Sequence, residues 1–175
     1  MENFKIFLFL EGDDDERFFK KILINRFREK CNRVQIVKYA QMSHNGIIKL
    51  LKTIKYKENW DYIFLSDINS AECYPNKKSL IETRFEYIEI EKIVIVIMEI
   101  ESWYLAGINN DFLRSINANL MDQGCNHVDK ERFNLLIPQD MPRVLFMNKI
   151  LDNYNIDLAL ENNESFEHFL RTFLD

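Results

Sequence analysis

Short apolar runs alternate along the first hundred residues with longer segments in which apolar side chains recur every three or four positions. The runs predict buried strands, and the spaced segments predict helices that cover them. Strands that alternate with helices in this way form right-handed βαβ units and a parallel sheet with helices on both faces. The predicted strands are 4–10, 34–40, 61–67 and 92–99, and the predicted helices between them are 14–30, 45–57 and 75–89.

The pattern changes after residue 100, where helical spacing replaces the alternation. We expect helices near 109–122, 140–153 and 163–174. The run KIVIVIME at 92–99 is β-branched and apolar on both faces, which predicts an interior strand of the sheet. The fold class is therefore α/β, with a Rossmann-like, mainly parallel sheet. We expect a single domain over 1–175, with a core at 1–108 and a helical extension at 109–175 packed on that core.

Composition supports a globular chain. It has 175 residues, of which 47% are hydrophobic and 29% charged, enough to bury a core. No secretory signal and no apolar run of about 18 residues is present, so we expect a cytoplasmic protein without a membrane span. The three cysteines, Cys31, Cys73 and Cys125, are far apart and form no CxxC motif, which is typical of reduced thiols.

Charge is divided unevenly along the chain. Residues 1–60 carry 13 Lys and Arg against 8 Asp and Glu, whereas residues 61–175 carry 10 against 20. A basic N-terminal part beside an acidic cluster fits an enzyme that holds a phosphate backbone over metal ions. The same lysines would also be found on the solvent face of any amphipathic helix, so charge alone leaves nucleic-acid binding open.

Acidic residues follow three of the predicted strands. Glu11 ends the first strand, Asp67 the third and Glu99 the fourth. Because ligands of open α/β sheets bind at the carboxyl ends of the strands, these acids should meet at one edge. Such a set of oxygen ligands predicts a site for Mg²⁺ or Mn²⁺. The neighbouring Asp13 and Asp14 are better explained as helix caps and solvated charge.

Three segments together resemble the Toprim domain. FLEGDDDERFF at 9–19 resembles its first motif, with Glu11 as the motif glutamate and Asp15 as the second acid. IFLSDINSAE at 63–72 resembles the second motif, in which Asp67 matches but Asn69 replaces the usual second aspartate. IMEIESWYLAGI at 97–108 is similar to a segment of small stand-alone Toprim-like proteins related to nucleases of the overcoming-lysogenisation-defect type.

The resemblance implies metal-dependent cleavage of phosphodiester bonds in DNA or RNA, in a defence system and with a partner such as an ATPase. The implied ligands of Mg²⁺ or Mn²⁺ are Glu11, Asp15, Asp67, Asn69 and one of Glu99 and Glu101. Glu11 would also move a proton, and Asp15 would bind the metal or a water. Arg143 is a candidate cation for the phosphate of the transition state, with plain surface charge as the alternative.

Two other functions stay open. The neutral Asn69 favours a metal-binding or regulatory module that works with a partner protein and does not turn over. A response-regulator-like or phosphatase-like domain also places acids at strand ends around Mg²⁺, but no matching lysine follows the fourth strand. Oligomeric state is not indicated by any pattern in the chain.

Overall fold

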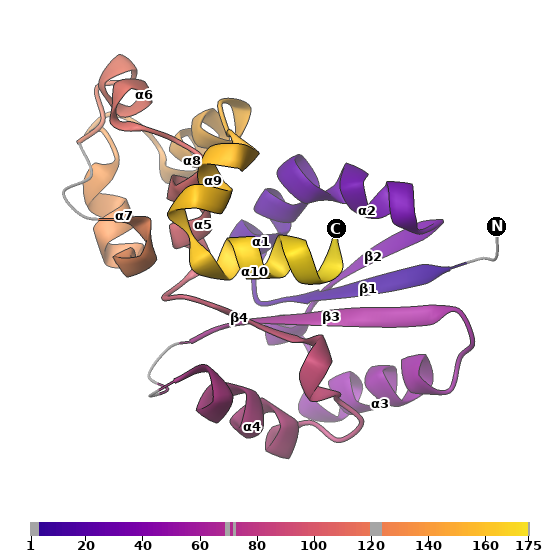
Figure 1. Cartoon of the computed structure of the whole chain (residues 1–175). Coiled ribbons are helices and arrows are strands. Elements are labelled where there is room, and N and C mark those ends of the chain that lie inside the picture. The colour runs from indigo at the N-terminus through magenta and orange to yellow at the C-terminus, as the bar shows by residue number, and fades with distance from the viewer. Residues whose placement is uncertain (1–3, 69–70, 72, 120–123, 175) are drawn as a thin grey trace. The chain divides into compact units, whose positions relative to one another are not determined.

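The computed structural model describes residues 4–68, 71, 73–119 and 124–174 of the chain (Figure 1). The chain divides into two compact units, Met1–Ile95 and Val96–Asp175. Each unit is described below by itself. The predicted packing of a helical extension on the sheet stays a prediction.

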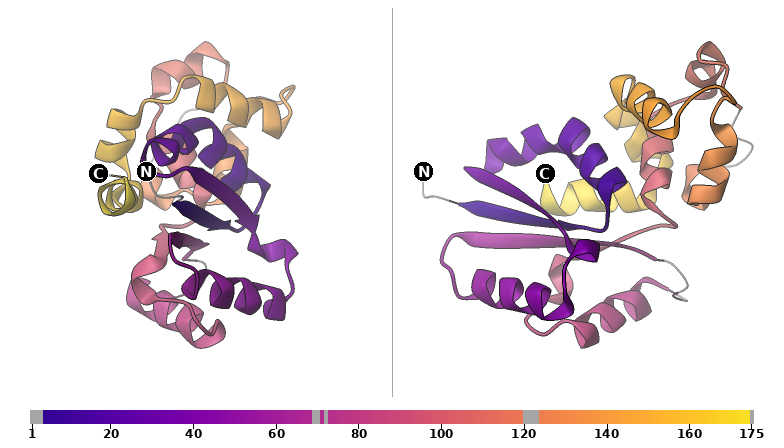
Figure 2. Two further views of the ribbon diagram at one scale, coloured as in Figure 1. Left: turned by 90° about the vertical axis from the view of Figure 1, so that its right-hand side faces the viewer. Right: turned by 180° about the vertical axis from the view of Figure 1, so that it is seen from behind.

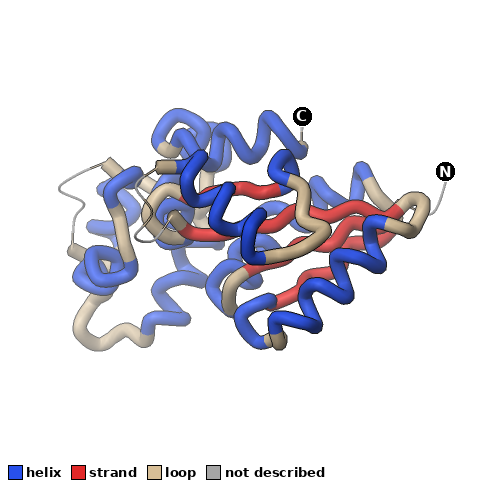
Figure 3. Tube along the Cα trace, turned by 90° about the horizontal axis from the view of Figure 1, so that it is seen from below, coloured by secondary structure: helices blue, strands red, loops and turns tan. Residues whose placement is uncertain are grey.

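The first unit contains a four-stranded sheet in the order β2-β1-β3-β4 (Figure 3). β1 pairs in parallel with β2 on one side and with β3 on the other, and the sheet is parallel throughout. The α/β class predicted from the sequence is therefore confirmed. The elements in chain order are β1 (Lys5–Leu10), α1 (Asp13–Phe18), α2 (Ile24–Lys30), β2 (Arg33–Lys38), α3 (His44–Lys55), β3 (Trp60–Asp67), α4 (Tyr74–Arg84) and β4 (Ile93–Val96).

Helices cover both faces of this sheet, with α1 and α2 on one face and α3 and α4 on the other (Figure 2). Side chains alternate between the faces along each strand, so Phe7 and Phe9 of β1 point to the α3 and α4 side. There they join a buried apolar cluster with residues of neighbouring strands and helices: Val37, Ile47, Leu51, Ile54, Tyr62, Phe64, Ile81, Phe85, Ile88, Ile93 and Ile95.

The helix predicted at 14–30 differs from the prediction in its N-cap residue and in the type of helix at its middle. Gly12 is its N-cap, where we expected an aspartate, and the Gly12 N–H donates to Asp15 Oδ2 at 3.0 Å. A π-helical turn at Phe19–Leu23 separates α1 from α2. The carboxylate of the N3 residue thus satisfies the cap, so no side chain was needed at the N-cap position itself.

The strand predicted at 92–99 is shorter than expected and lies elsewhere in the sheet. β4 ends at Val96, and Met98 follows with a φ of 59°. All residues of β4 are buried, as its apolar run predicts. The predicted interior position is wrong, because β4 follows β3 at the end of the strand order. A continuous apolar run reports burial on both faces and contains no information on the order of strands.

The second unit is helical in its described residues. The predicted helix at 163–174 is confirmed as α10, whereas the predicted helix at 109–122 is limited to α6 in the described residues. Three short helices, α5, α7 and α9, were not predicted, because each is only about two turns long. The helices are α5 (Ile100–Ala106), α6 (Asn110–Ser115), α7 (Lys130–Leu136), α8 (Arg143–Asp152), α9 (Ile156–Asn162) and α10 (Glu164–Phe173).

A buried polar network holds the second unit together. The Ser165 hydroxyl accepts from Trp103 Nε1 at 2.8 Å and from the Ile97 N–H at 3.2 Å, and it donates to Asn163 Oδ1 at 2.8 Å. The Trp103 ring also packs against Phe166 at a centroid distance of 5.1 Å. Trp103 is therefore a core residue of this unit. Among the described residues, no helix combines the length and the apolar character needed to cross a membrane.

Candidate functional site

The strand order defines where a ligand would bind in the first unit. From β1 the chain moves to β2 on one side, and it then returns past β1 to β3 on the other side. The connections after β1 and β3 thus leave toward opposite faces of the sheet, and ligands of open α/β sheets bind at the carboxyl ends of two such strands. Glu11 follows β1 directly, and Asp67 is the last residue of β3. Two of the predicted site residues therefore lie at this switch point.

Glu11 is held by a tyrosine from a third strand end. Tyr39 follows β2 in a short 3-10 turn, and its hydroxyl donates to Glu11 Oε2 at 3.2 Å. The same hydroxyl makes a hydrogen bond with the Ser66 side chain of β3. The Tyr39 ring stacks on Phe64 with the centroids 4.6 Å apart. Tyr39 thus connects the carboxyl ends of β1, β2 and β3.

The charges of three carboxylates act on the Tyr39 hydroxyl. Burial is the largest cause that raises the pKa of Tyr39, followed by the negative charge of Glu11; Asp15 and Asp67 raise it further. A phenol near several carboxylates stays protonated, because its own ionisation would add another negative charge. That Glu11, Asp15 and Asp67 share one metal site stays a prediction.

Asp15 lies in the first turn of α1 and is 6% exposed. Its Oδ2 accepts the hydrogen bond from Gly12 described above. A buried carboxylate at this position gains from the helix dipole and from the cap bond, so part of its role is structural. Its charge nevertheless acts on Tyr39, which places it within the same acidic edge.

The other acids of the cluster at 13–16 form ion pairs. Asp13 contacts Lys38 Nζ at 2.7 Å, Asp14 contacts Arg17 at 2.5 Å, and Glu16 contacts Lys20 at 2.5 Å. The hydrogen bond from Lys20 is the largest cause that lowers the pKa of Glu16. These three side chains are engaged on the helix surface, which agrees with the surface role expected for Asp13 and Asp14, whereas neither of them is the helix cap.

The donor chemistry of this edge fits a hard cation. Carboxylate oxygens from Glu11, Asp15 and Asp67 are the ligands that Mg²⁺ and Mn²⁺ prefer, and Mg²⁺ retains several waters in addition. Within the described ranges, however, no group of three or more His, Cys, Asp and Glu side chains is spaced to hold an ion. Asn69, predicted as a further ligand, lies outside the described residues.

Glu99 and Glu101 belong to the second unit and have different surroundings. Glu99 is the N-cap residue of α5, and its Oε2 accepts from the Lys130 N–H at 2.5 Å. Glu101 is 3% exposed and forms an ion pair with Arg143 Nη2 at 2.6 Å. Arg143 also donates to Asn134 at 2.7 Å and lies over the Phe133 ring.

Burial is the main cause that raises the pKa of Glu101, and the Arg143 hydrogen bond opposes it. Arg143, predicted as a cation for the phosphate, is instead engaged with a carboxylate of its own unit. Whether Glu99 or Glu101 contributes to the acidic edge of the first unit stays a prediction.

Two residues of the edge were not predicted from the sequence. Tyr39 contacts Glu11, and Lys38 holds Asp13 and also contacts Glu16 at 3.1 Å. Both come from the carboxyl end of β2, which is parallel to β1 and therefore ends at the same edge. The strand predicted at 34–40 contained both residues, whereas β2 ends at Lys38, two residues earlier than predicted, so neither was recognised as part of the strand end.

The geometry defines the chain's first unit as a doubly wound, parallel α/β unit with an acidic edge at its switch point. No family model and no curated protein sequence matches the chain. Among solved structures, it is similar to the C-terminal region of the Burkholderia pseudomallei OLD protein, with 14% identity, a TM-score of 0.47, and coverage of 98% of this chain and 95% of that chain. The similarity is too low to assign residues, activity or partners, so the function proposed below depends on the chain's own residues.

Proposed function

We propose that the protein is a metal-dependent phosphodiesterase that cleaves nucleic acid, with its site at the carboxyl ends of β1 and β3. One observation carries this proposal: Glu11 and Asp67 follow neighbouring strands at the topological switch point of the sheet, where their charges and that of Asp15 act on the Tyr39 hydroxyl. Like charges brought this close repel one another, and a bound cation would offset that repulsion. The motifs around Glu11 and Asp67 resemble those of the Toprim domain, which supports the same chemistry.

Each residue has a proposed role. Glu11 and Asp67 would hold Mg²⁺ or Mn²⁺ directly, and Asp15 would hold it directly or through water. When bound, the ion polarises the phosphoryl oxygen and lowers the pKa of a water. Tyr39 donates a hydrogen bond to Glu11 and so keeps that carboxylate oriented toward the acidic edge. Glu11 would accept or return a proton during the reaction.

The test is a cleavage assay on single-stranded, double-stranded and supercoiled DNA and on RNA, with Mg²⁺ or Mn²⁺ and with chelator. We expect metal-dependent cleavage, and Asp67→Ala should lower its rate by roughly a thousand-fold, because a metal ion supplies several kcal/mol of transition-state stabilisation. Asp13→Asn is the matched control: it removes one carboxylate of the same cluster, but one that pairs with Lys38. This control should cleave at nearly the wild-type rate.

Loss of activity in both variants, or in neither, would contradict the assigned site. Wild-type protein that cleaves none of the four substrates, alone or with an added partner ATPase, would remove the nuclease proposal.

A module without turnover is the second candidate, and the neutral Asn69 favours it. Asn69→Asp separates the two functions. In an enzyme whose second metal position is weak, the added carboxylate should tighten metal binding and raise the cleavage rate. In a module that binds metal without catalysis, it should tighten metal binding alone. Calorimetric titration with Mn²⁺, run beside the cleavage assay, measures both effects.

A further inference from the structure

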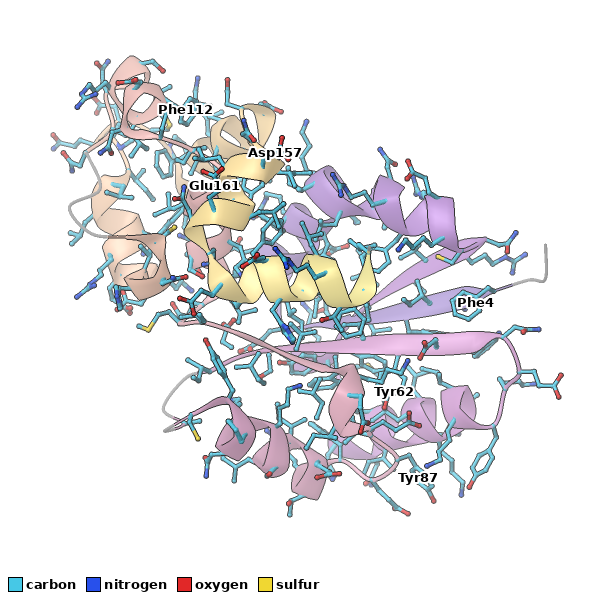
Figure 4. The ribbon with its side chains drawn as sticks, in the orientation of Figure 1. Phe4, Tyr62, Tyr87, Phe112, Asp157 and Glu161 are labelled. Atoms are coloured by element: carbon cyan, nitrogen blue, oxygen red, sulfur yellow. The ribbon has the colours of Figure 1, made fainter. Side chains whose placement is uncertain are left out.

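A second cleft opens at the opposite edge of the sheet in the first unit. It has a volume of about 660 Å³, and its lining residues belong to the end of α2, the start of β1, the start of β2 and the loop before it. Figure 1 shows where these elements lie. Phe4, labelled in Figure 4, marks this edge, and its carbonyl accepts from the N–H groups of Asn32 at 3.0 Å and Arg33 at 3.3 Å. The loop that lines the cleft is therefore fixed to the start of β1.

The charge of this cleft is the reverse of that at the acidic edge. Its lining contains the four cations Lys5, Arg28, Lys30 and Arg33 and a single carboxylate, Glu29. The net positive charge is concentrated on a short stretch of chain, while the whole protein has a formal charge of −5. Anions should therefore be attracted to this edge rather than to the molecule in general.

Helix capping explains only part of this charge. Arg28 and Lys30 lie in the last turn of α2, where cations offset the negative end of the helix dipole. Lys5 and Arg33 are the first residues of β1 and β2 and have no such role. They are register partners in the parallel pair, so their side chains leave the same face of the sheet, which is the face of Phe7 and opposite to α2; the four cations therefore line the cleft from both faces of the sheet.

Lys5 is positioned by aromatic rings. Its Nζ lies 4.3 Å from the centroid of Phe7 and 4.7 Å from that of Trp60. Contact with the ring faces holds the ammonium without neutralising it, because neither ring carries a net charge. Arg28 and Arg33 are both exposed and can reach a ligand in the cleft. Arginine is well suited to phosphate, since its planar group donates two parallel hydrogen bonds.

We propose that this basic cleft is a binding site for phosphate groups, separate from the acidic edge. The phosphate could belong to a nucleic-acid backbone or to a free nucleotide, and both present the same oxygen acceptors to Arg28 and Arg33. The proposal goes beyond the cleavage function and does not depend on it, because the cleft contains none of the residues of the acidic edge.

The experiment compares two double variants that lose the same charge. Arg28→Gln with Arg33→Gln removes two cations of the cleft, and Lys49→Gln with Lys55→Gln removes two exposed cations of α3. Binding of a labelled 20-base-pair duplex, a 20-nucleotide single strand and ATP is measured by fluorescence anisotropy. Chelator is present throughout, so that metal at the acidic edge does not contribute.

We expect the cleft variant to bind its phosphate ligand at least tenfold more weakly, and the α3 variant to change affinity by less than about twofold. For the duplex, the slope of log affinity against log salt should fall by about 1.8 in the cleft variant, as for two lost phosphate contacts. Tight binding of duplex or single strand identifies a nucleic-acid backbone, and tight binding of ATP that competes with them identifies a nucleotide.

Equal losses in the two variants, or no binding of any of the three ligands by the wild type, would overturn the proposal. Melting curves of both variants check that each is folded. Because cleavage is not measured here, an inactive protein that still binds phosphate in the cleft would count against the proposed nuclease alone.

Discussion

Glu11 and Glu101 are both glutamates next to an apolar segment, yet their surroundings are opposite. Glu11 is half-buried at a strand end, accepts from the neutral Tyr39 hydroxyl and has further carboxylates nearby. Glu101 is 3% exposed, lies inside a helix and pairs with Arg143. A buried carboxylate that already has a cation partner is satisfied within its own unit. A carboxylate among other carboxylates is better placed to bind a cation from solution, which is the basis of the proposed site.

The largest expected effect concerns the Glu101–Arg143 pair. Arg143→Met should lower the free energy of unfolding by about 2–3 kcal/mol at pH 7, because it leaves a buried carboxylate without its cation. Burial already raises the pKa of Glu101 in the folded protein. The folded state then holds the Glu101 proton more tightly than the unfolded state does. The contribution of Glu101 to the free energy of unfolding therefore falls as pH rises above 4.5. Arg143→Met should therefore lower the free energy of unfolding less at pH 5 than at pH 7.

Urea unfolding measures this effect, and Trp60→Phe in the background leaves Trp103 as the reporter of the second unit. Arg114→Met is the control, since its partner Asp111 is 85% exposed and the pair should contribute little. Similar losses in the two variants would show that Glu101 is not a buried ion-pair partner.

Metal binding at the acidic edge should have the next largest effect. Wild-type protein should gain about 1.4 kcal/mol when Mn²⁺ is tenfold above its dissociation constant, by mass action. Glu11→Gln should gain much less, and without metal its melting temperature should equal or exceed that of the wild type, because one of several like charges is removed. Thermal melts over a range of Mn²⁺ concentrations test this, with Asp13→Asn as the control. Melting temperatures indifferent to Mn²⁺ in all three proteins would remove the metal site.

Alkaline pH should reveal the environment of Tyr39. Its pKa is raised by burial first and by the Glu11 charge second, so the unfolded chain releases this proton at lower pH than the folded protein. The contribution of Tyr39 to the free energy of unfolding is therefore fully present below pH 10. Above pH 10 it falls by about 1.4 kcal/mol per pH unit. Tyr39→Phe should unfold with a shallower pH dependence between pH 10 and 11. Tyr62 and Tyr154, whose pKa values are also raised by burial, remain in both proteins.

Urea titrations across this pH range give the slope of the unfolding free energy against pH for the wild type and for Tyr39→Phe. Parallel slopes in the wild type and Tyr39→Phe would mean that Tyr39 titrates normally, and the charges of the carboxylates would then not act on it.

The smallest effect is expected for the ion pair between Asp13 and Lys38. Both side chains are in contact with water, with 69% and 28% exposed. Asp13→Asn should shift the melting temperature by less than about 2 °C, and the shift should vanish in 1 M salt, where surface charges are screened. A larger or salt-independent shift would assign Asp13 to the acidic edge and make it unsuitable as the control in the cleavage assay.

Local patterns in the sequence determined the elements of the first unit and the edge at which its acids meet. The short length and the aromatic and β-branched content of an apolar run such as 61–67 indicate a strand, and parallel strands end at a common edge, so Glu11 and Asp67 could be placed together without coordinates. Other features depend on contacts between residues that are distant in sequence. Tyr39 reaches Glu11 only because β2 pairs with β1, and β4 lies last in the strand order because of its pairing with β3. The partner of Glu101 is 42 residues away, since a buried charge is matched by whichever cation the packing of helices brings to it.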